Sequence, residues 1–226
     1  MTILRRTSFQ SGIGACTDVR TRRHVSGRHV VAFLFLALRL LPGSSIGAQT
    51  RVEHPEAGIA ITRPAGWHTG TVAQVQANRA RTKLSDPELQ VALATRAALP
   101  LLVFTKYEEP HPGLNPSIQI TLRHGLAGTP VRLLSDALAV MRRGFPDLQT
   151  VEPVRQTTVD GLPAAHVRVT YTLATQTGLK ARVSSRLWLV PRGALMFLIG
   201  MSGSESGTDK CDAECDSALQ SLSISR

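Results

Sequence analysis

The second half of the chain alternates apolar and polar residues at the two-residue period of β-strands. Turn signals interrupt the alternation at Asp160-Gly161, at 176–178 and at 191–193. These breaks predict four antiparallel strands in series from Val151 onward. The segment 194–201, ALMFLIGM, is apolar at both parities, which predicts a central strand covered on both faces.

Two further strands are predicted at 101–107 and 117–123, with a Pro-rich loop between them. In the strand that follows Gly161, apolar residues alternate with polar ones, and this places His166 on the polar face. The C-terminal segment SLSISR is expected to return as an edge strand.

Helical spacing of apolar residues is clearest at 129–143, where Thr129 is a suitable N-cap. A second helix is expected to begin near residue 85, and a weaker one at 72–81. A last helix, at about 209–220, opens with acidic residues, which suit the positive end of a helix dipole. Helices packed on an antiparallel sheet make an α+β fold.

Residues 29–48, HVVAFLFLALRLLPGSSIGA, follow the order of a secretory signal peptide: a basic flank, an apolar run and a small residue at the end. We expect cleavage between Ala48 and Gln49. The apolar run covers about 12 residues, whereas a membrane-spanning helix needs about 20. The mature protein, 49–226, is therefore expected to be a single soluble domain outside the cytoplasm, periplasmic or secreted, with no stable membrane span.

The leader, 1–48, is longer than most signal peptides, and initiation near Val25 would restore the usual length. The formal charge of the whole chain is +10. The leader carries seven Arg and one Asp, so most of the basic excess lies in the segment that cleavage removes. This division argues against nucleic-acid binding. A hydrophobic content of 42% excludes a disordered chain.

Three cysteines are too few for a disulfide-scaffolded protein. Cys16 precedes the apolar run, so it cannot be the lipid-modified first residue of a lipoprotein. Cys211 and Cys215 remain after cleavage, and an oxidising compartment favours a disulfide between them. Their i,i+4 spacing on a regular helix opposes it, because the Cβ atoms would lie too far apart. Two buried core residues, or a thiol or metal site, are the alternatives.

Two other clusters carry candidate chemistry. Glu108, Glu109 and His111 share one loop and, with His68 or His124, are residue types that bind divalent metals. The spacing matches no established metal motif, and the prolines predict a stiff, solvated loop.

The segment GMSGS at 200–204 resembles a nucleophile elbow around Ser202. Its last position is Ser204 rather than Gly, which favours a strand that ends in a turn. Trp67 and Trp188 are expected in the core or at its margin.

The segment GIAITRPAGWHTG at 58–70 resembles the opening strand and turn of exported PsbP/DcrB-like domains, which are related in fold to PsbP of photosystem II and to the Ran-binding Mog factors. The order of the later elements is similar over roughly 58–224. The resemblance implies an α/β/α sandwich around an antiparallel sheet, usually in extracytoplasmic or accessory roles, without shared catalytic residues.

The sequence therefore favours an exported, non-catalytic accessory or binding protein, whose partner is an envelope protein or a small ligand. No cofactor is expected. The competing hypothesis is a thiol or metal-dependent envelope enzyme that uses Cys211 and Cys215.

Overall fold

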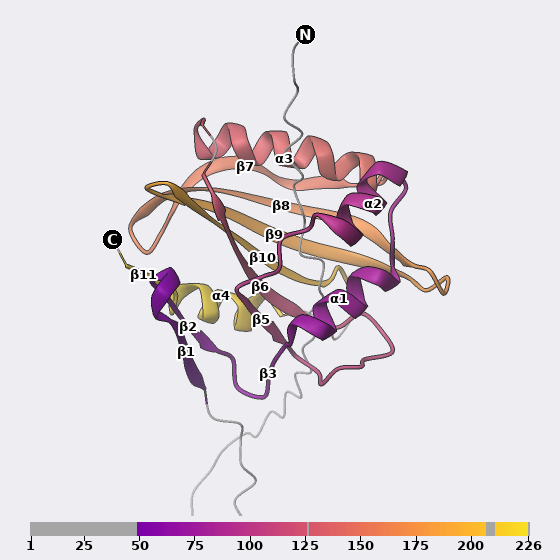
Figure 1. Ribbon diagram of the computed structural model, residues 1–226, viewed down its shortest axis with the longest axis horizontal. Helices are drawn as coiled ribbons and strands as arrows, with labels where there is room; N and C mark the ends of the chain where they lie inside the picture. Colours follow the sequence, from indigo (N-terminus) through magenta and orange to yellow (C-terminus); the bar gives the residue numbers. More distant parts are fainter. Residues whose placement is uncertain (1–48, 126, 207–210, 226) are drawn as a thin grey trace, which may run out of the picture.

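The computed structural model describes residues 49–125, 127–206 and 211–225. In these residues, four α-helices pack on a central antiparallel sheet, so the α+β prediction is confirmed (Figure 1). None of the helices in these ranges is both long and apolar enough to cross a membrane. The apolar run at 30–41 and Ala48 of the predicted cleavage site lie outside the described residues.

The central sheet contains eight strands in the order β3-β5-β6-β10-β9-β8-β4, and β7 also pairs with β8. The bounds are β3 His68–Thr69, β4 Thr82–Lys83, β5 Leu102–Thr105, β6 Ser117–His124, β7 Gln149–Val159, β8 Leu162–Thr175, β9 Lys180–Arg192 and β10 Leu195–Ser204. Strands β7 to β10 are the four predicted in series. As predicted, β10 is central, because it pairs with both β6 and β9.

One face of the sheet is covered by α3 (Pro130–Gly144), whose N-cap is Thr129 as predicted. Leu134, Leu138 and Met141 of this helix join a core cluster with apolar residues of β8, β9 and β10. Helices α1 (Val72–Arg81) and α2 (Pro87–Thr95) follow one another beside it, and α2 contacts both α1 and α3 (Figure 1). Both occur where the sequence predicts them.

The opposite face is covered by α4 (Asp212–Gln220) and by a three-stranded sheet of β1 (Thr50–His54), β2 (Ile59–Arg63) and β11 (Ser223–Ile224). Ile61 and Cys215 pack there against residues of β6 and β10. The C-terminal tail is an edge strand as expected, but it belongs to this second sheet. Helix α4 begins at Asp212, and Asp209 lies outside the described residues.

His166 lies on the face of β8 opposite to Val167 and Val169, as predicted, but another layer covers that face. Its side chain is only 7% exposed and stacks on Trp188, with 4.7 Å between the ring centroids. Both Trp188 and Trp67 are buried in the core. Alternation along a strand shows which side chains share a face, but it does not show whether another layer covers that face.

Candidate functional site

The two faces of β6 differ in character although both are buried. Ile118 and Ile120 join the core beneath α4. Ser117, Gln119 and Thr121 alternate with them and lie on the other face, each with 8% of its surface exposed or less. Polar side chains therefore form the interior surface where an apolar layer is usual.

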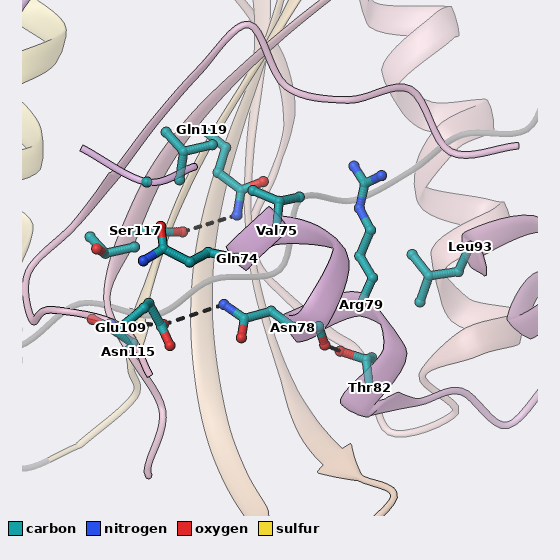
Figure 2. A pocket seen from close by; sticks show the side chains of 13 residues that line it. Gln74, Val75, Asn78, Arg79, Thr82, Leu93, Glu109, Asn115, Ser117 and Gln119 are labelled. Carbon is teal, nitrogen blue, oxygen red and sulfur yellow. Dashed lines mark hydrogen bonds between the residues drawn. The ribbon is translucent and has the colours of Figure 1, made fainter. Parts of the chain in front are cut away.

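Ser117 and Gln119 form the floor of a small cavity under α1, which we name the inner hollow. Its volume is about 30 Å³, enough for one or two water-sized groups. Figure 2 shows Gln74, Val75 and Asn78 of α1 facing this floor. The lining also includes Gly70, Arg79, Thr82, Leu93, Val103, Thr105, Glu109 and Asn115.

Local structure sets the position of α1 over the floor. The Thr71 hydroxyl accepts a hydrogen bond from the Gln74 amide N–H, and the Gln74 side chain accepts one from the Thr71 N–H, so a capping box begins the helix. The Gly70 N–H donates to the Val103 carbonyl at 2.9 Å. A Cβ atom at Gly70 would lie 2.8 Å from Val103 Cγ1, so this close approach requires glycine.

Glu109 closes one end of the inner hollow. Its side chain is 5% exposed. Oε1 accepts hydrogen bonds from the side-chain amides of Asn78 (3.3 Å) and Asn115 (2.9 Å), and Oε2 accepts one from the His111 N–H (2.9 Å). Arg81 Nη2 lies 3.7 Å from Oε2. The expectation of a solvated loop is therefore wrong for Glu109, because these donors hold its carboxylate against α1.

A second cavity, which we name the outer hollow, lies on the other side of this network and has a volume of about 130 Å³. Asn78, Thr82, Glu109 and Asn115 line both cavities, so the two are neighbours. We call them together the paired hollow. The lining of the outer hollow includes polar residues, among them Arg81, His111, Thr175 and Thr177, and apolar ones, Pro112, Leu114, Leu173 and Leu179.

The structure does not gather the histidines of the metal hypothesis. His111 stacks on Tyr107, with 4.8 Å between the ring centroids. His68 is exposed on β3 and His124 is exposed at the end of β6. Within the described residues, no three His, Cys, Asp or Glu side chains are placed to hold a metal ion.

Cys211 and Cys215 are buried in the core beside Ala218 and Leu222. Cys211 is the N-cap of α4 and has non-helical dihedral angles, so the regular-helix spacing does not apply. The sulfur atoms of the two residues lie 2.8 Å apart. Burial raises the pKa of the Cys215 thiol to about 12, which disfavours a reactive thiolate. A disulfide between the two residues stays a prediction.

Ser202 lies inside β10 and is 1% exposed. Its hydroxyl shares a hydrogen bond with the Ser185 hydroxyl, which in turn contacts the hydroxyl of Tyr171. Burial raises the pKa of Tyr171 to about 12. The segment that resembles a nucleophile elbow is therefore part of a strand, as the sequence favours, and the three hydroxyl groups are hydrogen-bonded to one another.

Comparison with known proteins shows similarity of fold. No protein-family model matches the sequence, and no curated protein matches it. Among solved structures, the chain is similar to PsbP of Synechocystis, with 10% identity, a TM-score of 0.49, and coverage of 83% of this chain and 99% of that one. The resemblance seen in the sequence is confirmed as a distant similarity to structures of this kind.

Two other solved structures are similar to the chain at comparable distances. LpqN of Mycobacterium tuberculosis has 16% identity and a TM-score of 0.49, covering 79% of this chain and 91% of that one. Mog1p, a Ran-binding protein of Saccharomyces cerevisiae, has 12% identity and a TM-score of 0.44, covering 78% and 95%. The chain spans about half, 49%, of a matched Bacteroides thetaiotaomicron protein. At these distances the similarity concerns the fold and carries no residue role.

Sequence reasoning missed Ser117, Gln119, Asn78 and Asn115. The segment SIQITLR contains the signal, because its polar residues alternate with isoleucines. The same alternation describes a strand whose polar side faces solvent. Only the position of α1 distinguishes a covered polar floor from an exposed one.

Proposed function

We propose that the protein is an exported, non-catalytic binding protein whose small polar ligand enters the paired hollow. The polar floor of β6 beneath α1 is the observation that carries the proposal. Burying a polar group costs free energy unless a partner satisfies it, and an apolar floor would pack under a helix without that cost. A floor of amide and hydroxyl groups beside a cavity is suited to ligand recognition.

Binding is favoured over catalysis because the Glu109 carboxylate at the site is already hydrogen-bonded within the protein. Three hydrogen bonds and a nearby arginine already engage the Glu109 carboxylate. A general base needs a free oxygen within reach of the substrate proton. Glu109 instead holds the loop 106–116 against α1 and so shapes both parts of the paired hollow.

Export rests on the leader sequence. The apolar run at 30–41, its basic flank and Ala48 form the signal-peptide pattern. Strand β1 begins at Thr50, so cleavage after Ala48 would remove no part of a described element. Fractionation of cells, with N-terminal sequencing of the mature protein, tests this part of the proposal. A full-length chain in the cytoplasmic fraction would contradict it.

Complementation of a deletion strain tests the binding site. Gln119→Leu replaces the amide of the floor with an apolar side chain of similar size, and we expect it to abolish complementation. Thr121→Val is the matched control, because Thr121 is buried on the same face of β6 but does not line either hollow. Melting temperatures of both purified variants verify that each is folded. Full complementation by a folded Gln119→Leu protein would refute the proposed site.

A further inference from the structure

The Arg79 guanidinium brings a positive charge to the inner hollow that no acidic side chain balances. Its hydrogen bonds go to the carbonyl oxygens of Ala97 and Ala98, at 3.2 and 2.7 Å. Both acceptors are neutral, and within the described part of the chain no carboxylate forms an ion pair with Arg79. A guanidinium has five N–H donors, so Arg79 keeps donors that these two hydrogen bonds do not use.

A second arginine raises the free-energy cost of that charge. Arg123 continues the polar face of β6 beyond Thr121, and burial lowers its pKa. The pKa of Arg79 is also lowered, first by burial and then by the charge of Arg123. A water molecule would satisfy the remaining N–H donors of Arg79 but not its charge, whereas an anion satisfies both.

The floor of the inner hollow supplies uncharged donors. Gln119 Nε2 donates one hydrogen bond, to Ser117 Oγ at 3.3 Å, and has a second N–H. The Ser117 hydroxyl accepts that bond and can donate its own proton. The volume of about 30 Å³ suits one or two water-sized groups, and the two oxygen atoms of a carboxylate are of this size.

Glu109 lines the same hollow but does not supply the counter-charge. Its oxygens accept hydrogen bonds from Asn78, Asn115 and the His111 N–H. Figure 2 shows the Arg79 side chain extending from α1 on the side away from Glu109. Arg79 is half-buried, so its end of the inner hollow lies near the protein surface. A ligand at this end stays on one side of the Glu109 hydrogen bonds and does not enter the outer hollow.

From this arrangement we infer that the inner hollow binds the carboxylate of a small organic acid, with the Arg79 guanidinium as its counter-charge and Gln119 and Ser117 as further donors. The planar set of N–H groups on arginine matches the two oxygens of a carboxylate better than it matches a spherical anion. This inference rests on the proposed function and names the ligand class of the same site.

Three probes separate charge from shape: acetate, acetamide and chloride. Acetamide has the size of acetate without its charge, and chloride has the charge without the pair of oxygens. We titrate the mature protein in chloride-free buffer and follow the amide chemical shifts of β6 and α1. Acetate should bind at least about tenfold more tightly than either other probe. Equal binding of acetamide or chloride, or no acetate-dependent shift in these elements, would overturn the assignment.

A fourth probe, N-acetylglycine, tests the source of the carboxylate. Its carboxylate follows a peptide group, as at the C-terminus of a peptide. The small volume of the inner hollow predicts weaker binding than for acetate. Tighter binding of N-acetylglycine would show that the ligand is a peptide end and not a small acid.

Matched variants locate the counter-charge. Arg79→Gln and Arg96→Gln each remove one positive charge, but Arg96 is exposed at the C-terminal end of α2 and lines neither hollow. Arg79→Gln should weaken acetate binding at least about tenfold, and Arg96→Gln less than about twofold. Acetate should raise the melting temperature of Arg96→Gln protein but not that of Arg79→Gln protein. Equal effects of the two substitutions would show a general influence of net charge and would refute the role of Arg79.

The two proposals fail in different ways. If acetate does not bind but folded Gln119→Leu protein still fails to complement, the site stands and the ligand class is wrong. If acetate binds as expected but Gln119→Leu protein complements fully, the ligand class stands and the proposed function of the site is wrong.

Discussion

The two faces of β6 show how one strand serves two purposes. Toward α4, Ile118 and Ile120 fill a core with residues from the small sheet and from β10. Toward α1, Ser117 and Gln119 form a polar floor beside a cavity. The apolar face stabilises the fold, and the polar face forms part of the proposed binding site. The predictions below test this division by comparing changes on the α1 side of the sheet with changes on the α4 side.

The largest effect is expected for Ile120→Ala on the α4 side. Ile120 is fully buried, and its truncation should lower the free energy of unfolding by about 2–5 kcal/mol through lost burial and the cavity left behind. Urea unfolding measures it. Thr121→Val, one residue along on the other face, should change stability by less than about 1.5 kcal/mol. Similar losses for both variants would show that the two faces contribute equally to stability.

Glu109→Gln tests the network that shapes the paired hollow. The new amide keeps one acceptor oxygen and has an NH2 group in place of the other, so its N–H donors must face either the Asn78 and Asn115 amides or the His111 N–H. We expect a loss of about 1–3 kcal/mol in unfolding free energy. Chemical denaturation measures the loss. Glu108→Gln is the control, because Glu108 is exposed, and it should leave stability unchanged. A stable Glu109→Gln protein with an unaltered loop would contradict the role of the carboxylate.

The α4 side of the sheet is not apolar throughout, and His166 makes it sensitive to pH. Burial lowers the pKa of His166 to about 4 from its ordinary value of 6.5. Between these values the unfolded chain binds the proton and the folded chain does not. Stability should therefore fall as pH drops from about 6.5 to about 4, by at most about 1.4 kcal/mol per pH unit.

Unfolding free energies are measured over this pH range for the protein and for His166→Gln. The difference between the two separates the contribution of His166 to the pH dependence from that of the acidic residues. The variant should show the shallower dependence. Identical slopes for the two proteins would show that His166 takes up its proton in the folded state as readily as in the unfolded chain.

The smallest effect is expected where α4 meets the sheet. Asp212 at the start of α4 lies 3.3 Å from Arg168 and 3.8 Å from Arg186, which oppose each other on β8 and β9. Asp212→Asn should cost less than about 1 kcal/mol, because Asp212 is half exposed, and added salt should reduce the loss. Asp136→Asn, in an exposed pair on α3, is the control. A loss that does not change with salt would exclude an electrostatic origin.

Much of the fold was predictable because local signals decide it. The Asp160-Gly161 turn, the N-cap Thr129 and the doubly apolar segment 194–201 each act within a few residues, and the structure confirms the elements that they predict. The leader, the cleavage position and the disulfide stay predictions, since the structure does not test them.

The candidate site was not predictable to the same degree. Glu109 and His111 were recognised, but in a solvated loop. Gln119 was assigned only to a strand. The burial of Glu109 and the covered position of Gln119 both depend on α1. This helix is far from both residues in sequence but lines the same cavity in the fold.

The sequence alone thus determined the two-residue period of the strands, the positions of the turns and the helix caps, because each of these depends on the backbone geometry of a short segment. Tertiary structure alone decided which polar faces are covered. An alternating strand leaves the same pattern whether its polar side meets water or lies beneath another layer, as the sides that carry His166 and Gln119 do. The free energy of burying those groups depends on partners that only the assembled layers supply.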